Sequence, residues 1–283
     1  MDHCRSSSRL RFLCLCVFAL LAAASGARAQ DADYRNLDPG HPIAVEDAQP
    51  IEYRALELQY SFPHFTRERR GAWSIGLEPE FKWGIYKDLQ FGLSSAYVAA
   101  HAAGRTVYSA HDHQLHLLYN FNQETRAWPA LAIRPELTIR SGGLGSRHEH
   151  AALKGIVTKT LGLNRVHLNA SYTLGPTAQP GRGGHLVNRY FYGAAYERTF
   201  PLRFIVLLAD VYALRPIDNS PAEVVFEAGA RVQLSPGWVL DAGVSTGAAR
   251  ASVGPDFGFT FGMSRNFSLR WLHPTKSSLA GAP

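Results

Sequence analysis

Apolar and polar residues alternate with a period of two along most of the chain after residue 53. In residues 72–85, the odd positions carry apolar side chains such as Trp73 and Phe81, whereas the even positions carry polar ones such as Glu80 and Lys82. Side chains of a β-strand point alternately to its two faces. Such segments are therefore predicted to be strands with one apolar face and one polar face.

Twelve segments of the chain fit this pattern. They cover residues 54–62, 72–85, 89–97, 114–122, 131–140, 151–161, 166–174, 188–199, 203–214, 222–234, 238–246 and 256–267. A soluble sandwich and a transmembrane barrel both contain many alternating strands, so the alternation alone does not separate them.

The connections favour the transmembrane barrel. Longer loops, at 63–70, 99–112, 141–150, 175–185, 215–221 and 247–255, alternate with short turns near 86–88, 123–128, 162–165, 200–202 and 235–237. A barrel with one rim outside the cell and the other in the periplasm has this asymmetry. We therefore predict an all-β fold: a transmembrane, antiparallel, up-and-down β-barrel of about 12 strands.

Aromatic residues lie near the ends of the predicted strands, where the interfacial girdles of a membrane barrel are expected. They are Trp73, Trp83, Tyr86, Tyr97, Trp128, Tyr172, Tyr196, Tyr212 and Trp238. Charged residues occupy the opposite face in most strands, which predicts a polar lumen.

The start of the chain resembles a secretory signal peptide. Arg5, Arg9 and Arg11 precede or begin an apolar run at residues 10–24, and Ala27-Arg28-Ala29 matches the small-x-small cleavage pattern. Cleavage would make Gln30 the first mature residue. The apolar run is too short to favour the alternative of an uncleaved transmembrane helix. All three cysteines, Cys4, Cys14 and Cys16, lie in the removed part, so the mature chain would have no disulfide and no Cys-ligated metal.

The predicted organisation has four parts: a signal peptide (1–29), a periplasmic N-terminal segment (30–52), the barrel (53–271) and a C-terminal tail (272–283). The N-terminal segment is either a linker or a partial plug in the barrel mouth. Four of the 29 Lys and Arg and one of the 23 Asp and Glu lie in residues 1–29, which leaves a mature net charge of +3. This small charge gives no argument for nucleic acid binding.

Three stretches resemble a known family. Residues 42–52 (PIAVEDAQPIE) running into 57–60 (ELQY), residues 209–212 (ADVY) and residues 254–264 (GPDFGFTFGMS) are similar to the outer-membrane channel family named for the MetA pathway of phenol degradation. The resemblance implies a twelve-stranded channel for small molecules, including hydrophobic or aromatic compounds, but it does not assign phenol to this chain. One departure is that Phe267 or Trp271 would supply the terminal aromatic residue that barrel assembly recognises, yet a tail follows through Pro283.

The predicted lumen carries charges of both signs. The candidate pore-lining residues are Glu57, Glu80, Lys82, Arg134, Glu136, Arg140, Arg189, Asp210, Glu227 and Arg231. They could line a water-containing pore, or they could form an ion-paired ladder that fills a narrow barrel. No ring of a single sign stands out, so we expect no strong ion selectivity.

The sequence also contains candidate residues for two other kinds of site. The histidines His111, His113, His116, His148 and His150 have spacings that suit a transition metal, although polar surface loops explain them more simply. Ser141, Ser146, His148 and His185 could form the Ser-His pair of an outer-membrane lipid hydrolase, but no lipase motif surrounds them. A structural or adhesive role is the third functional class, after a channel and an enzyme.

Together these observations predict a non-enzymatic channel in the bacterial outer membrane that passes small molecules by passive diffusion. No cofactor is expected. The expected partners are outer-membrane lipid, the barrel-assembly machinery and a diffusing solute, and the expected state is a monomer.

Overall fold

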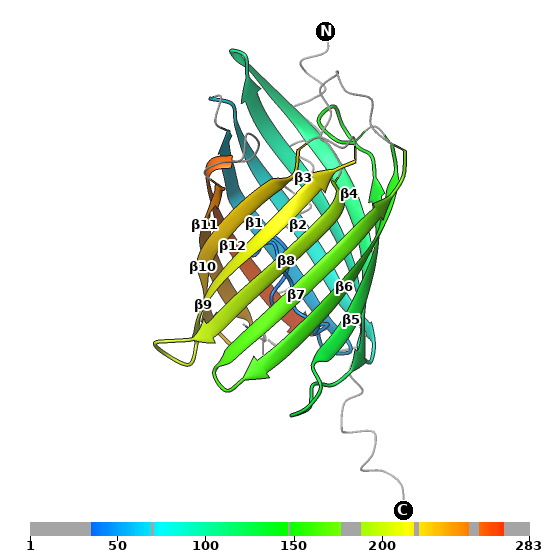
Figure 1. The fold of residues 1–283 in the computed structure, drawn as a ribbon, viewed down its shortest axis with the longest axis vertical. Helices are drawn as coiled ribbons and strands as arrows, with labels where there is room; N and C mark the ends of the chain where they lie inside the picture. The colour runs from blue at the N-terminus through cyan, green and yellow to red at the C-terminus, as the bar shows by residue number, and fades with distance from the viewer. Residues whose placement is uncertain are drawn as a thin grey trace, which may run out of the picture.

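The computed structural model describes residues 35–68, 71–146, 148–176, 188–217, 221–248 and 255–268. The predicted signal peptide, the tail and Trp271 therefore lie outside the described residues. Within them the fold is all-β (Figure 1). The strands are β1 (Ala55–Glu68), β2 (Trp73–Tyr86), β3 (Leu89–Ala102), β4 (Arg105–Asn122), β5 (Ala130–Ile139), β6 (His150–Leu161), β7 (Asn164–Leu174), β8 (Asn188–Thr199), β9 (Ile205–Pro216), β10 (Glu223–Ser235), β11 (Trp238–Gly247) and β12 (Pro255–Ser268).

Every strand pairs antiparallel with its neighbours in sequence, and β12 pairs with β1 to close the barrel. In the closing pair, Leu58 lies opposite Arg265 and Tyr60 lies opposite Met263. Closure leaves no edge with unpaired backbone groups. The predicted twelve-stranded antiparallel barrel is thus confirmed. No helix of the described residues is long and apolar enough to cross a membrane.

The two faces of the strands differ as the alternation predicts. On the outer face, Phe121, Leu168 and Val244 are each about half exposed. On the inner face, Gln59, Lys82 and Arg231 are at most 2% exposed. An apolar exterior with a polar interior reverses the arrangement of a water-soluble protein and suits a lipid environment.

The first expected loop, 63–70, is largely strand. β1 continues to Glu68 because the Phe62–Pro63 step lies in a β-bulge, where the register with both β2 and β12 shifts between Ser61 and His64. Proline has no N–H to give to a ladder, and a bulge is a position that tolerates it. Pro63 was therefore a misleading sign of a loop.

The expected loop 99–112 is also wrong. β3 and β4 remain paired to Ala102 and Arg105 and turn through Ala103 and Gly104, whose φ angles are 49° and 74°. Positive φ at both central residues is typical of the tight hairpin turns that match strand twist. Weak alternation in an alanine-rich stretch hid this extension from the sequence pattern.

The connections nevertheless distinguish the two ends of the barrel. At the turn end lie the short β2–β3, β6–β7 and β10–β11 links together with the somewhat longer β4–β5 and β8–β9 links. At the loop end lie the β1–β2, β3–β4, β5–β6, β7–β8, β9–β10 and β11–β12 connections.

Tyr212 is an exception among the predicted girdle residues. Its ring stacks on that of Phe191, with the centroids 5.6 Å apart, and Phe191 packs against a buried cluster inside the barrel. Tyr212 therefore faces the lumen. It has the same parity along β9 as Asp210, whose carboxylate also lies inside the barrel.

The lipid-facing assignment is testable on one hairpin. We expect Leu168→Arg, in the middle of β7, to destabilise the refolded barrel in phospholipid bilayers by about 2–4 kcal/mol, because it places a charge deep in the apolar layer. Leu163→Arg, in the adjacent turn, should cost at most about 1 kcal/mol, because the charge stays near the interface. Urea unfolding in vesicles measures both, and equal losses would contradict the assignment.

Candidate functional site in the barrel lumen

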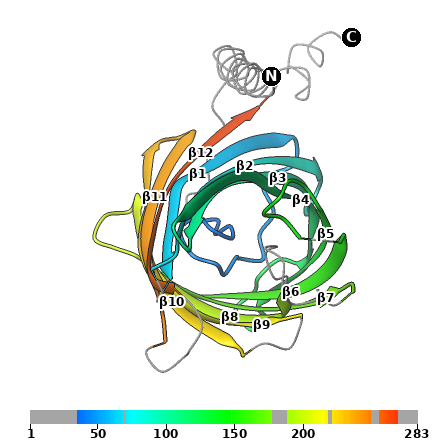
Figure 2. The same cartoon turned by 90° about the horizontal axis from the view of Figure 1, so that it is seen from above.

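Residues 35–54, here called the lumen segment, precede β1, and most of them lie inside the barrel (Figure 2). The side chains of Leu37, Ile43, Val45 and Ala48 are at most 1% exposed. The segment forms neither helix nor strand, apart from one isolated bridge between Asp38 and His41. Gly40, His41 and Asp47 donate their backbone N–H groups within the segment, and its other buried backbone groups need partners on the barrel wall.

Two carboxylates of neighbouring strands accept backbone N–H groups of the lumen segment. Asp210 on β9 accepts from Ala44 and from Val45, each at 3.0 Å. Glu227 on β10 accepts from Ala44 at 2.7 Å. Asp210 and Glu227 lie opposite each other in the β9–β10 ladder, so a positively polarised stretch of backbone meets both acids at one point.

Uncharged polar side chains hold the next part of the segment. The Asn169 amide both accepts from the Glu46 N–H (2.9 Å) and donates to the Glu46 carbonyl (2.8 Å). Thr158 accepts from the Ala48 N–H at 2.9 Å, and Asn120 donates to the Ala48 carbonyl at 2.7 Å. These partners come from β7, β6 and β4, so the segment is fixed to several sides of the wall at once.

Glu46 of the lumen segment forms ion pairs with two wall cations. Its carboxylate bridges Arg134 on β5 and Lys154 on β6, with both N–O distances 2.7 Å. Arg134 also contacts Glu136 at 3.3 Å. Burial alone would raise the pKa of Glu46, but the two cations together outweigh burial and hold this pKa below its usual value.

Two further acids of the segment pair with wall cations. Asp38 forms an ion pair with Lys82 on β2. Asp47 pairs with Arg165 on β7 at 2.6 Å, and Arg165 also contacts Glu197 at 3.1 Å. Burial raises the pKa of Asp47 to about 7, although Arg165 opposes the rise. The charge on Asp47 is therefore less favourable than the charge on Glu46.

Glycines on the wall make room for the segment. A Cβ atom built on Gly193 of β8 would lie 2.5 Å from a methyl group of Val45. Cβ atoms on Gly229 and Gly243 would lie 2.7 and 2.9 Å from ring atoms of Pro42. The close approach between wall and segment depends on the absence of side chains at these positions.

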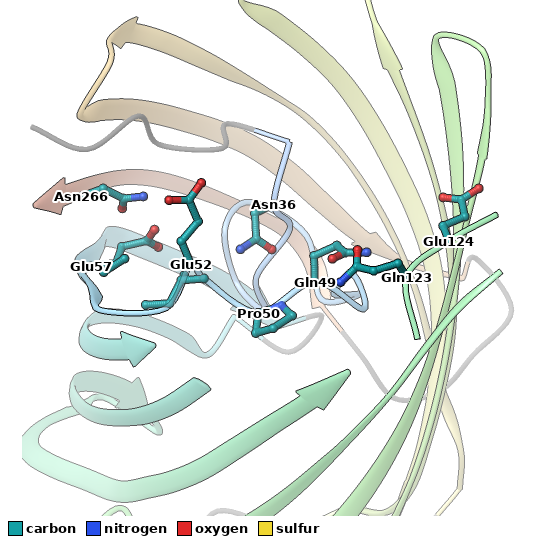
Figure 3. A pocket seen from close by; sticks show the side chains of 10 residues that line it. Asn36, Gln49, Pro50, Glu52, Glu57, Gln123, Glu124 and Asn266 are labelled. Atoms are coloured by element: carbon teal, nitrogen blue, oxygen red, sulfur yellow. The ribbon is translucent and has the colours of Figure 1, made fainter. Parts of the chain in front are cut away.

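Cavities flank the segment on both sides. The turn-end cavity, of about 320 Å³, is lined by residues of the segment together with wall and turn residues (Figure 3); its lining includes Asn36, Gln49, Glu52, Glu57, Gln123, Glu124 and Asn266. The loop-end cavity, also about 320 Å³, is lined by Pro39, Gly40 and Ala44 of the segment and by residues of β4 to β9. The two cavities share no lining residue.

Most of the predicted pore-lining residues lie on the inner wall. Glu57, Glu80 and Asp38 gather around the Lys82 ammonium. Arg134 pairs with Glu46 and Glu136. Asp210 and Glu227 both accept the Ala44 N–H, and Arg231 donates to the carbonyl of Asn36. Five of these residues contact the lumen segment directly: Lys82, Arg134, Asp210, Glu227 and Arg231.

Arg140 and Arg189 are placed differently from the others. Arg140 follows the end of β5 and is exposed. The Arg189 guanidinium donates to the Thr173 carbonyl at 2.8 Å and lies 5.8 Å from the centroid of Tyr172. Both therefore lie at the loop end, away from the lumen segment.

The histidines and serines of the alternative sites do not come together. His116 is buried in the lumen beside Glu80 (3.5 Å), whereas His148 is exposed in the β5–β6 loop. The Ser146 hydroxyl donates to the backbone carbonyl of His148, not to its imidazole. His185 lies outside the described residues. Among those that are described, no three His, Cys, Asp or Glu side chains are placed to hold a metal ion.

Sequence reasoning missed several residues that hold the segment. They are buried polar residues of the wall: Gln90, Asn120, Thr158, Arg165 and Asn169. The Gln90 amide oxygen accepts from the Ile51 N–H at 2.9 Å. The other four contact Glu46, Asp47 or Ala48. Four of the five carry uncharged amides or hydroxyls, which attract less attention than charges, and Arg165 lies in the expected turn 162–165, although β7 already begins at Asn164. Their polar parity was visible, however, and it points to the same inner face.

Comparison with known proteins supports the fold. A scan against protein-family models and a search of curated proteins both find no match. Among solved structures, the barrel is similar to the COG4313 outer membrane channel from Pseudomonas putida F1, with a TM-score of 0.56 and 13% identity over 83% of this chain and 100% of that one. This degree of identity shows a shared fold and no more.

Two porins also match, with lower scores. The NanC porin has a TM-score of 0.48 and 8% identity, covering 76% of this chain and 100% of its own. The KdgM porin has a TM-score of 0.46 and 12% identity, covering 76% and 99%. At these scores neither porin adds to the argument.

The two acids Glu46 and Asp47 allow a matched test of how the segment is held. Glu46→Gln leaves Lys154 without its carboxylate, and loss of one partner of a buried ion pair costs about 3–5 kcal/mol. Asp47→Asn should cost much less, because Arg165 keeps Glu197 and the charge on Asp47 is already unfavourable. A cysteine at the fully buried position Ala48 reports release, since the chain from Gln30 onward has no cysteine of its own.

We expect a membrane-impermeant thiol reagent to label that cysteine at least about tenfold faster in Glu46→Gln than in the parent, given the size of the lost pair. In Asp47→Asn the rate should rise far less. If both variants label at the same rate, Glu46 is not the dominant contact.

Proposed function

We propose that this protein is a passive outer-membrane channel for small molecules, in which the lumen segment sets the width of the passage. The single observation behind this proposal is the placement of the segment, held to the wall by polar side chains of several strands and flanked by cavities on both sides. A barrel that only needed filling could use larger wall side chains. Gly193, Gly229 and Gly243 instead make space for a separate piece of chain.

The proposed location in the outer membrane follows from the apolar outer surface of the barrel. The exposed apolar belt requires lipid, and closed antiparallel barrels with asymmetric ends are the β-structures that suit the outer membrane. The proposed setting includes the lipid, the assembly machinery that inserts such barrels, and a diffusing solute. The proposed unit is the monomer, because β1 and β12 already close one barrel within one chain.

The finer family assignment is also a proposal. The fold shared with an outer membrane channel of Pseudomonas putida F1 agrees with the resemblance of residues 42–52 and 254–264 to the family named for the MetA pathway. Residues 42–52 form much of the lumen segment, so the part of the sequence that carries the resemblance is also the part that narrows the lumen.

Single-channel conductance in planar bilayers tests the proposal. The full mature chain should give small discrete steps, and a chain that begins at Ile51 should give steps several-fold larger, because its wall is unchanged but the obstruction is gone. Folded barrel content is checked by heat-modified migration in gels. Folded barrels with no conductance in either form would refute the channel function.

Ion selectivity gives a second prediction. Glu136 lines the loop-end cavity, whereas Glu149 is exposed in the β5–β6 loop. Glu136→Gln should move the reversal potential in a salt gradient toward anion preference, since charges that line a narrow passage set its selectivity. Glu149→Gln should change it little at moderate salt because bulk ions screen exposed charges. Equal shifts would mean that ions do not pass along the cavity.

A further inference from the structure

The loop-end cavity has chemically distinct walls. Arg134 and Lys154 supply cationic groups from β5 and β6. Phe191 and Leu214, from β8 and β9, supply apolar surface. Its volume of about 320 Å³ is at the small end of the range for small-molecule sites. A cavity of this kind suits a compact ligand with one charged end and one apolar end.

The cationic wall already binds a carboxylate. The Glu46 oxygens lie 2.7 Å from both Arg134 and Lys154, so this side chain occupies the place that the acid group of a ligand would take. Arg134 is 5% exposed, and its Nε has no hydrogen-bond partner among the described residues. The guanidinium therefore keeps donor capacity that the lumen segment does not use.

The balance of charges in the loop-end cavity determines how a ligand carboxylate could bind beside Glu46. Two cations, Arg134 and Lys154, are matched by two acids, Glu46 and Glu136, and a third acid of the cavity lining, Asp112, accepts the Ser146 N–H. A ligand carboxylate added to this set would leave an excess negative charge in a poorly solvated space, which is costly. Exchange with Glu46 keeps the balance and lets Glu46 move to water.

The apolar wall lies next to the cations. The Lys154 ammonium is 5.4 Å from the centroid of the Phe191 ring, and Phe191 stacks on Tyr212 behind it. A ligand whose carboxylate replaces that of Glu46 would thus have apolar surface within the length of one ring or a short alkyl chain. Inorganic anions lack the group that would use this surface.

We propose that the loop-end cavity is a binding site for a small organic carboxylate, which binds Arg134 and Lys154 in exchange for Glu46. Binding and full seating of the lumen segment then exclude each other. A solute of this class would release the segment from the wall as it enters. Only this opening step rests on the proposed channel function, whereas the binding site does not.

Calorimetric titration of the refolded full chain with cyclohexanecarboxylate tests the site directly. We expect binding of the acid, no binding of cyclohexanecarboxamide, and weaker binding of acetate, which lacks the apolar part. In Glu46→Gln the apparent affinity for the acid should rise at least about fivefold, because the competing carboxylate is gone and the competent state is more populated. Asp47→Asn, whose acid contacts Arg165 outside this cavity, should bind as the parent does.

Arg134→Gln and Lys154→Gln should each abolish measurable binding, with folding checked by heat-modified migration. Equal binding of acid and amide, or unchanged affinity in both Glu46→Gln and Arg134→Gln, would overturn the site. Equal affinity for acetate and the ring acid would reduce it to a general anion site and overturn the assigned ligand class.

The opening step is measured separately, as conductance with and without the acid in the same electrolyte. A several-fold increase that Arg134→Gln removes supports the exchange. Binding without any change in conducting barrels overturns the coupling between site and segment. Binding to a barrel that never conducts supports the site and refutes the channel function instead.

Discussion

The pairing of β12 with β1 is the contact on which the rest of the molecule depends. An open sheet would carry two rows of unpaired backbone groups, and lipid tails cannot form hydrogen bonds with them. The closed ring pairs these groups within one chain. Closure also fixes the direction of every side chain. Alternate residues of twelve strands must point inward, so their charged and polar groups are concentrated in one lumen.

The lumen segment resolves the electrostatic problem that closure creates. Wall acids such as Asp210 and Glu227 need donors, and the backbone N–H groups of Ala44 and Val45 supply them. Wall cations such as Arg134 need acids, and Glu46 is one of them. Each side satisfies groups that would otherwise be buried without partners. The segment is thus held by side chains and could leave without breaking any strand ladder, which is the condition for a movable obstruction.

The contacts also explain why the two ends of the lumen differ. At the turn end, the segment leads into β1, and a Cβ on Gly84 would collide with the Glu52 carbonyl, so the backbones are in close contact there. Cavities of similar volume lie at both ends, but only the lining of the loop-end cavity includes cationic side chains and an aromatic ring, whereas acids and amides dominate the turn-end lining. A solute from the loop end would therefore meet Glu46 and its partners before the tightly packed part, which gives this ion-paired cluster its functional interest.

The sequence by itself determined the class of fold, because an alternation with a period of two in twelve segments allows little besides strands with one apolar face. It also separated most charged residues from the apolar face, since parity follows directly from the backbone. It could not find the strand continuing past Pro63 or the hairpin at Ala103, because bulges and tight turns depend on neighbouring strands. Only the tertiary structure decided between linker-like and lumen positions for residues 35–54, whose contacts with Arg134, Asn169 and Asp210 join positions far apart in the chain. Local patterns carry no information on such pairings, and the free energy that favours them exists only once the barrel is closed.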